Sequence, residues 1–281
     1  MTKITKSAIK KSYKPLDPKT HKGTQGHALL IGGSYGKIGS ITLSSKAALH
    51  SGAGLVTAFV PECGYEIVQT AIPEVMVLTD VETKHLSKIE YEFSPNAIGI
   101  GPGIGQEQAV QNALHDFLQH VKSPLVIDAD ALNILSQHQE WLSLLPENTI
   151  LTPHPKELSR LIGSHESQEE SEKAALKFAA EHKIILVCKG APTKITNGEN
   201  WFENTTGNAA LATAGSGDVL TGIITGLLAQ GYAPLEAAKF GVYLHGLTAD
   251  LAIKTTAPES FVASDIIEYL GKAFLQISRA S

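Results

Sequence analysis

The sequence predicts an α/β protein with a mostly parallel central sheet and helices on both faces. Along the 281 residues, short apolar runs typical of strands alternate with longer segments whose apolar positions repeat at helical spacing. Several strand-like runs, such as those in "VIDAD" and "LVCKG", are apolar without a break, which is typical of strands covered on both sides. These patterns favour three layers, with the sheet between two layers of helices.

The strands and helices are expected in a regular order. Strands are expected at residues 27–33, 55–61, 97–101, 124–130, 149–153 and 184–190. Helices are expected at residues 41–53, 107–120, 155–163, 171–182, 219–230 and 235–255. A hairpin is expected over residues 193–207, with its turn at Asn197-Gly198, because Asn-Gly is favoured in two-residue hairpin turns.

The same pattern predicts the domain organisation. Residues 1–25 are polar and lack a strong periodicity, so we expect an N-terminal arm with at most one short helix. No linker rich in proline, glycine or serine interrupts the remainder, and the sequence has no internal repeat. We therefore expect residues 26–281 to form a single domain.

The composition argues against several classes of function. The net charge is −5 and the isoelectric point about 6.1, which gives no electrostatic footprint for nucleic acid. The basic N-terminal stretch lacks the apolar run of a secretory signal, and no apolar run is long enough to span a membrane. Cys63 and Cys188 lack metal-ligand spacing and are expected to be buried free thiols. We expect a cytoplasmic protein without a nucleic-acid or membrane partner.

Two glycine-rich segments follow expected strands but match neither common phosphate-binding motif. "GGSYGKIG" differs from a P-loop because Ile31 stands in place of its first glycine and Lys37 is followed by Ile38. "GIGPGIG" differs from the dinucleotide fingerprint because its glycines alternate and Pro102 interrupts them. Both lie at the carboxyl ends of strands, where open α/β sheets bind ligands. A turn without a ligand explains either segment equally well.

Two acids end the strand expected at residues 124–130. Asp128 and Asp130 are able to hold Mg²⁺ through water, or to accept hydrogen bonds from a ribose or from nearby amides. Asp130 is also placed to cap a helix that begins at Ala131. We expect one of these acids to be structural and the other functional, with Asn133 close by.

The next two strands are each followed by a polar loop. His154 lies between two prolines, which fix the direction of its imidazole, and Glu157 and Arg160 are spaced for a local ion pair on a helix. Lys189, together with free backbone amides and the Thr193 hydroxyl, suits the recognition of phosphate. A β-turn with a solvated lysine explains the second loop equally well.

The most specific segment is "TTGNAALATAGSGDVLTGIITGLLAQ". Gly215 and Gly217 leave backbone amides unblocked, and a helix that begins near Asp218 adds its free N–H groups and positive dipole end. This arrangement predicts an anion hole suited to a phosphoryl group. The alternative is that Asp218 only caps the helix. Thr213 and Ser216 already supply capping groups, which argues against this alternative. We interpret Asp218 as a base that takes a proton from a hydroxyl attacking the phosphoryl group.

Seven segments carry a resemblance to a known family, and they occur in the order found there. They are "GHALLIGGSYGKIGSITLSSKAALHSGAGLVT", "IGIGPGIG", "VIDADALNIL", "LTPHPKEL", "VCKGAPTKI", "TTGNAALATAGSGDVLTGIITGLLAQG" and "GVYLHGLTADL". From Gly26 onward, the chain resembles the ADP-dependent NAD(P)H-hydrate dehydratases of bacteria, within the ribokinase-like superfamily. The resemblance implies a ribokinase-like three-layer fold and repair of hydrated NADH and NADPH. ADP would phosphorylate the ring hydroxyl of the S-epimer, and elimination of phosphate would restore NAD(P)H.

The resemblance also implies roles for individual residues. Asp218 is the implied base, and the implied anion hole is Gly215, Ser216 and Gly217. The implied nucleotide-binding residues are Lys189, Gly190, Ala191, Pro192, Thr193 and Gly217. The implied substrate-binding residues are Ser40, Gly103, Asn133, His154, Asn208 and Asp218, with Asp128 and Glu157 as further candidates.

The resemblance further implies ADP or ATP as nucleotide, Mg²⁺ as cofactor, and a homo-oligomer, either a dimer or a tetramer. No dedicated cluster of metal ligands stands out in the sequence. Three positions depart from the family's pattern: Thr205 replaces a proline, Ser40 replaces a smaller residue, and Lys156 replaces a frequent glycine. About 25 residues precede Gly26, so we expect no epimerase domain.

Other functions share parts of this pattern. A small-molecule kinase of the same superfamily, acting on a vitamin-type alcohol, would share the turn around Asp218, and a stable phosphorylated product would identify it. A non-catalytic adenine-nucleotide-binding protein would not need Asp218 behind intact glycines. A nicotinamide oxidoreductase is disfavoured because neither glycine-rich segment fits the dinucleotide fingerprint.

Overall fold

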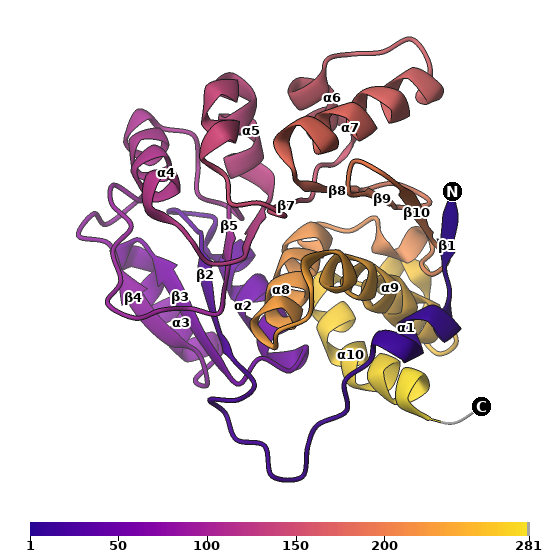
Figure 1. Ribbon diagram of the computed structural model, residues 1–281. Helices are drawn as coiled ribbons and strands as arrows, with labels where there is room; N and C mark the ends of the chain where they lie inside the picture. The colour runs from indigo at the N-terminus through magenta and orange to yellow at the C-terminus, as the bar shows by residue number, and fades with distance from the viewer. Residues whose placement is uncertain (280–281) are drawn as a thin grey trace.

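One ten-stranded sheet forms the middle layer of the protein, with helices on both faces (Figure 1). The structure is a computed structural model that describes residues 1–279. The strand order is β1-β10-β9-β8-β7-β6-β5-β2-β3-β4. Neighbouring strands are parallel, except that β9 is antiparallel to both β8 and β10. The predicted three-layer α/β fold with a mostly parallel sheet is therefore confirmed.

The described part of the chain contains the following strands and helices. The strands are β1 (Thr2–Ile4), β2 (His27–Ile31), β3 (Leu55–Val60), β4 (Met76–Thr79), β5 (Ala97–Ile100), β6 (Leu125–Ile127), β7 (Ile150–Leu151), β8 (Ile185–Cys188), β9 (Lys194–Thr196) and β10 (Trp201–Asn204). The α-helices are α1 (Lys6–Ser12), α2 (Ile38–His50), α3 (Tyr65–Ala71), α4 (Gln108–His120), α5 (Ala129–Gln137), α6 (Pro155–Ile162), α7 (Gln168–His182), α8 (Ser216–Ala229), α9 (Pro234–Ala252) and α10 (Ala263–Ser278).

Each face of the sheet has its own hydrophobic core. In β2, Ala28 and Leu30 pack into the core shared with α2, α8, α9 and α10, whereas Leu29 and Ile31 pack into the core shared with α4, α5, α6 and α7. All four side chains are fully buried. Because successive side chains of a strand point to opposite faces, an uninterrupted apolar run fits this position.

Close contact between α2 and α8 fixes the position of α8. A Cβ added at Gly222 of α8 would lie 2.1 Å from the Ser44 carbonyl oxygen of α2, and one at Gly226 would lie 2.5 Å from the Ser51 hydroxyl. Glycine therefore lets the two backbones approach more closely than any side chain would allow. As a result, α8 lies against β2, β5 and β6, and its first turn lies at their carboxyl ends.

Residues 1–25 are more closely integrated than the predicted arm. β1 pairs in parallel with β10, so that Ile4 lies opposite Asn204. Ile4 and Ile9 are 2% and 1% exposed and belong to the core beside α9 and α10. A three-residue strand carries no periodicity of its own, so its pairing depends on a partner that is distant in the sequence.

Several other predicted features need correction. The turn of the β9–β10 hairpin is longer than the predicted Asn197-Gly198 turn, because the Asn197 side chain accepts hydrogen bonds from the amides of Glu199 and Asn200. The helix predicted at residues 41–53 begins earlier and ends earlier, at Ile38–His50. The elements α3, β4 and α10 were not predicted. Cys63 and Cys188 are free thiols, but they are partly exposed rather than buried.

Among residues 1–279, no helix combines the length and the apolar character needed to cross a membrane.

We predict opposite effects of the same substitution at two helical glycines. Gly222→Ala should destabilise the protein by about 1–3 kcal/mol, because the added methyl group would overlap the α2 backbone. Gly271→Ala, in α10, should stabilise it by about 0.5–1 kcal/mol, because no atom lies within 4 Å of the added Cβ and alanine favours a helix. Urea unfolding measures both, and equal shifts would contradict the close α2–α8 contact.

Candidate active site

A cleft of about 790 Å³ opens at the carboxyl edge of the sheet, where β6 and β8 end. Its walls come from the start of α6, the loop after β8, the residues that join β10 to α8, and the sides of α8 and α9. Four sequence segments therefore meet at one place, those around Asp128, His154, Lys189 and Asp218. Asp128 and Asp218 are 90 positions apart in the sequence.

The turn before α8 presents free backbone amides to this cleft. Gly215 has φ +84°, a left-handed conformation that glycine adopts without strain, and it occupies the N-cap of α8 without a side-chain cap. Among residues 1–279, no group accepts a hydrogen bond from the amides of Gly217 and Asp218. These amides lie at the positive end of the helix dipole and can bind an anion.

The structure corrects the expected role of the small polar residues in this turn. Neither Thr213 nor Ser216 caps α8. The Ser216 hydroxyl instead lies 3.1 Å from Nε2 of His245, which also donates to the Ser216 carbonyl oxygen at 3.0 Å. Burial lowers the pKa of His245 to about 4, so this histidine is neutral at pH 7 and supports the turn from α9.

Asp218 stands in the first turn of α8, facing the cleft. Burial, followed by the nearby negative charge of Asp128, raises the pKa of Asp218 to about 6. A hydrogen bond from the Ser40 side chain and the charge of Lys189 act in the opposite direction. A carboxylate with a pKa close to neutrality is suited to accepting a proton and releasing it again.

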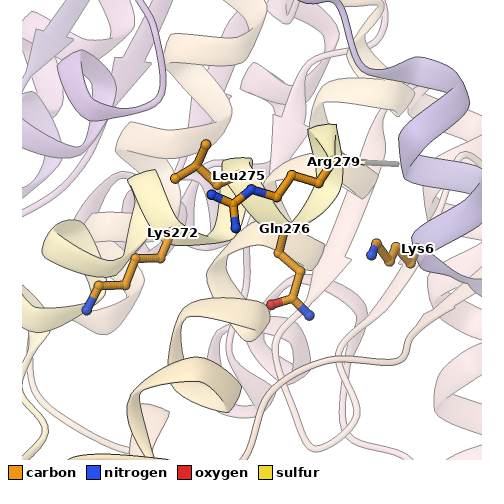
Figure 2. Close-up of a pocket in the computed structure, with 5 residues that line it drawn as sticks. All are labelled: Lys6, Lys272, Leu275, Gln276 and Arg279. Atoms are coloured by element: carbon orange, nitrogen blue, oxygen red, sulfur yellow. The ribbon is translucent and has the colours of Figure 1, made fainter. Parts of the chain in front are cut away.

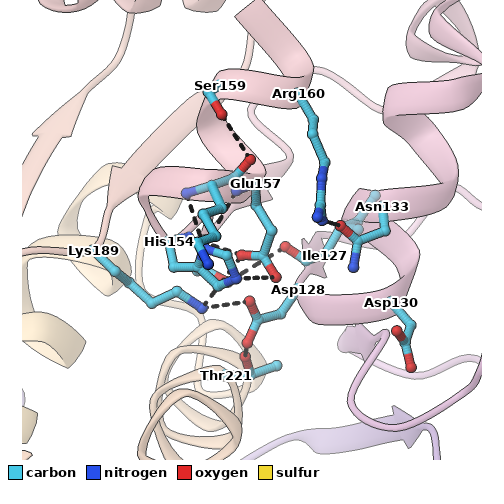
Figure 3. A network of polar contacts seen from close by, with 12 residues as sticks. Ile127, Asp128, Asp130, Asn133, His154, Glu157, Ser159, Arg160, Lys189 and Thr221 are labelled. Carbon is cyan, nitrogen blue, oxygen red and sulfur yellow. Dashed lines mark hydrogen bonds and ion pairs between the residues drawn. The ribbon is translucent and has the colours of Figure 1, made fainter. Parts of the chain in front are cut away.

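A buried acid holds Lys189 beside the free amides at the start of α8. Its Nζ lies 2.7 Å from one oxygen of Asp128, and the Thr221 hydroxyl donates to the other oxygen at 2.8 Å (Figure 3). Asp128 is 1% exposed and Thr221 is fully buried. A Cβ added at Gly217 would lie 3.3 Å from this Nζ. Glycine at position 217 therefore leaves the space between the ammonium group and the free amides open.

His154 and Glu157 form a reciprocal cap at the start of α6. Nδ1 of His154 accepts from the Glu157 amide at 3.3 Å, and the Glu157 carboxylate accepts from the His154 amide at 2.8 Å. This cap fixes the imidazole in the wall of the cleft, with Nε2 3.3 Å from a carboxylate oxygen of Glu157. The predicted ion pair of Glu157 with Arg160 is wrong, because Arg160 instead donates to Asn133 (Figure 3).

Burial is the largest cause of the pKa shifts at both members of this cap. It lowers the pKa of His154, with a further contribution from the charge of Lys189. It raises the pKa of Glu157, against the opposing effect of Lys189, whose Nζ lies 4.0 Å away.

Asp130 is structural, but it does not cap a helix as predicted. α5 begins at Ala129, and Asp130 accepts hydrogen bonds from the Gly105 amide at 3.0 Å and from the Gln106 side chain at 3.2 Å. Lys37 lies 3.4 Å away. The acid therefore joins the two glycine-rich segments that precede it in the chain.

The remaining predicted residues fall into three groups. Lys189, Gly190, Ala191, Pro192, Thr193 and Asn208 line the cleft. Ser40 and Gly103 are adjacent to each other beside Asp218, since a Cβ added at Gly103 would lie 3.2 Å from that of Ser40, but neither lines the cleft. Asn133 does not line it either, and its side-chain oxygen is occupied by Arg160.

Sequence reasoning missed three polar residues that support the site: Thr221, His245 and Asp250. Each is a polar side chain in a mostly apolar helix, which is the signal that was available. The Thr221 hydroxyl donates to the Asp128 carboxylate, and Nε2 of His245 donates to the Ser216 carbonyl oxygen. Asp250 accepts hydrogen bonds from Gly207 and Asn208.

The described residues form no preformed cage for a metal ion. No group of three His, Cys, Asp or Glu side chains with metal-binding geometry occurs among residues 1–279, and Lys189 and Thr221 occupy both oxygens of Asp128. Mg²⁺ typically takes one or two carboxylates together with substrate phosphates and water. The site therefore fits a magnesium ion held mainly by a nucleotide, with few ligands from the protein.

A second pocket, of about 410 Å³, lies where α10 meets α1 (Figure 2). Lys272, Leu275, Gln276 and Arg279 line it from α10 and the residue after it, and Lys6 lines it from α1. Among residues 1–279, its lining includes cations but neither a carboxylate nor a glycine turn.

Fold and site together define a ribokinase-like protein, with free backbone amides at a helix N-terminus beside a carboxylate. Residues 28–272 match a family described as NAD(P)H-hydrate dehydratase, and the chain belongs to this family.

Individual relatives agree with this assignment. An ADP-dependent (S)-NAD(P)H-hydrate dehydratase of Neisseria meningitidis is 40% identical over 245 residues, which cover 85% of this chain and 80% of that protein. The crystal structure of an ADP/ATP-dependent NAD(P)H-hydrate dehydratase from Bacillus subtilis, co-crystallised with ATP and Mg²⁺, is 30% identical with a TM-score of 0.86, covering 98% of both chains.

Other relatives are longer. A bifunctional NAD(P)H-hydrate repair enzyme of Moorella thermoacetica is 40% identical over 262 residues, which cover 89% of this chain and 49% of that enzyme. The chain thus spans about half the length of the bifunctional relatives that it matches.

We predict that Lys189→Met destabilises the protein by about 3 kcal/mol, because it leaves the buried charge of Asp128 without a partner. The double variant Asp128→Asn/Lys189→Met should recover most of that loss, since neither charge remains. Lys173→Met, which removes an exposed ion pair with Glu169, serves as the control and should cost less than about 1 kcal/mol. Equal losses in urea unfolding for the two single variants would show that Lys189 is not held by a buried charge.

Proposed function

We propose that this chain catalyses the ADP-dependent dehydration of the S-epimer of hydrated NADH and NADPH, which restores NAD(P)H. The observation that carries the proposal is the combination of two free amides, at Gly217 and Asp218, with a carboxylate whose pKa is raised to about 6. The sequence similarity to dehydratases of this specificity supports it.

The reaction proceeds in two stages. The ring hydroxyl attacks the terminal phosphorus of ADP while Asp218 takes the hydroxyl proton, a new P–O bond forms, and AMP leaves with the electrons of the broken P–O bond. The C–O bond of the phosphorylated ring then breaks. Phosphate departs with that electron pair, and the neighbouring carbon loses a proton as the double bond returns. Phosphate is a far better leaving group than hydroxide, which explains why phosphorylation precedes the elimination.

The residues around the cleft divide this work between them. The free amides of Gly217 and Asp218 form the anion hole for the phosphoryl group, and Gly215 and Ser216 shape the turn that presents them. Lys189, Gly190, Ala191, Pro192 and Thr193 bind the nucleotide, with Lys189 placed next to the transferring phosphate by Asp128. Ser40, Gly103 and His154 contact the hydrated dinucleotide near Asp218, and Glu157 orients His154.

The proposal extends to the setting of the reaction. Mg²⁺, bound to the nucleotide phosphates, would supply positive charge near the transferring group. We place the enzyme in the cytoplasm, as a homo-oligomer in which β1 and α1 belong to the same catalytic domain as the rest of the described chain. Size-exclusion chromatography with light scattering measures the oligomeric state.

The experiment that tests the function is a turnover assay on hydrated NADH with ADP, with ATP, and with neither. The reduced-nicotinamide absorbance should return only when a nucleotide is present, with one phosphate released per NADH. A stable phosphorylated product instead of NADH, or activity on a vitamin-type alcohol alone, would favour the small-molecule kinase. No reaction from folded protein that binds ADP would also contradict the dehydratase.

We predict that Asp218→Asn lowers turnover by about 10²–10⁴-fold or more, because it removes the base while keeping the shape of the site. The same variant should raise the melting temperature at pH 8. An acid whose pKa is raised by folding, here to about 6, destabilises the folded state when it ionises. This penalty is complete above pH 6 and disappears below about pH 4, the unfolded pKa. Unchanged turnover would exclude Asp218 as the base, and equal gains in melting temperature at pH 4 and pH 8 would exclude the raised pKa.

A further inference from the structure

The loop of residues 205–208, which follows β10, forms one wall of the cleft. It has no helix or strand of its own, yet each of its four residues is hydrogen-bonded to an element outside the loop. Loops that lack such bonds must be ordered when a ligand binds, at a cost in affinity. The bonds therefore mark this wall as preformed.

The bonds from α9 are the most numerous. The Thr206 hydroxyl donates to the Tyr243 carbonyl oxygen at 2.8 Å. Both oxygens of Asp250 are used, one accepting from the Gly207 amide at 2.9 Å and the other from the Asn208 side chain at 2.9 Å. The side-chain oxygen of Asn208 also accepts from the Ala210 amide, so both the nitrogen and the oxygen of this side chain are hydrogen-bonded.

A second anchor comes from the N-terminal strand. The Thr205 hydroxyl donates to the Ile4 carbonyl oxygen at 2.6 Å. Ile4 is itself fixed, because its side chain is buried and β1 pairs with β10. Thr205 is the position where the sequence departs from the proline frequent in the family, and its hydroxyl makes a bond that proline cannot make.

The same loop is connected to the segment assigned to the nucleotide. The Asn204 amide, at the end of β10, donates to the Thr193 carbonyl oxygen at 3.0 Å. The Asn204 side chain donates to the Thr206 carbonyl oxygen at 2.9 Å. A displacement of residues 205–208 would therefore pass through Asn204 to the loop of residues 189–193.

We propose that Asp250 is a positioning residue for the adenine nucleotide, which holds residues 205–208 as a rigid wall of the cleft joined through Asn204 to the loop of residues 189–193, with the Thr205–Ile4 bond as a second anchor. This inference rests on the proposed function for the identity of the nucleotide. Asp250 does not line the cleft and acts through Gly207 and Asn208.

ADP binding to the full chain, measured by titration calorimetry together with steady-state kinetics, tests the inference. Asp250→Ala should raise the Kd and KM for ADP about 10-fold, because two hydrogen bonds to a charged group are lost. The kcat at saturating ADP should change less than about 3-fold, since Asp218 and its amides stay in place. Thr205→Val should raise the Kd about 3-fold, and Thr205→Ser, which keeps the hydroxyl, should restore it.

Asp80→Asn provides the matched control. Asp80 also fixes a loop by accepting from backbone amides, those of Glu82, Ser87 and Lys88, but it follows β4 at the opposite edge of the sheet. This variant should lower the melting temperature and leave the Kd for ADP unchanged. An equal loss of ADP affinity in Asp80→Asn and Asp250→Ala would overturn the positioning role.

The remaining outcomes are also decisive. Wild-type affinity in both Asp250→Ala and Thr205→Val would refute the inference and leave the proposed function intact. Absence of ADP binding by the wild-type chain would overturn the proposed function as well. If Asp250→Ala does not fold, the comparison of Thr205→Val with Thr205→Ser decides the matter alone.

Discussion

Two backbone amides at the start of α8 have no protein acceptor within residues 1–279, and the rest of the site is arranged around them. They are exposed there because Gly222 and Gly226 let α8 lie directly on α2, which brings its first turn to the carboxyl edge of the sheet. Free amides at a helix start favour a bound anion by roughly 0.3–1 kcal/mol in exposed settings, and by more where water is excluded. For phosphoryl transfer, such a site would also need a base and a cation.

The pKa of Asp218 is set by a competition between opposing effects. The helix dipole would stabilise an ionised Asp218 by about 1 kcal/mol, yet its pKa rises to about 6. Burial and the charge of Asp128 therefore outweigh the helix dipole. Asp128 thus has two effects. Its charge raises the pKa of Asp218, and its carboxylate oxygen accepts a hydrogen bond from Nζ of Lys189 at 2.7 Å. Asp128, Glu157 and Asp218 together face a single lysine, and this excess of negative charge favours a nucleotide that arrives with its own cation.

Much of the fold could be predicted from the sequence, because strands buried on both faces and amphipathic helices have strong local patterns. The free amides at the start of α8 were predictable for the same reason, because Gly215, Gly217 and Asp218 lie next to one another in the chain. The pairing of β1 with β10 was not, since three residues carry no pattern and the partner lies about 200 positions away. Three hydrogen bonds were unpredictable for a similar reason, because they depend on how distant elements pack. They join Asp130 to Gly105, Thr221 to Asp128, and Asp250 to Gly207.

The most direct test of this account is the titration of Asp218 itself. In protein labelled with carbon-13 at aspartate, the carboxyl signal that disappears in Asp218→Asn belongs to this residue, and its chemical shift reports ionisation. The account predicts a midpoint near pH 6, because burial and Asp128 hold the proton on the carboxyl. A midpoint near pH 4, the value of a solvated aspartate, would contradict it.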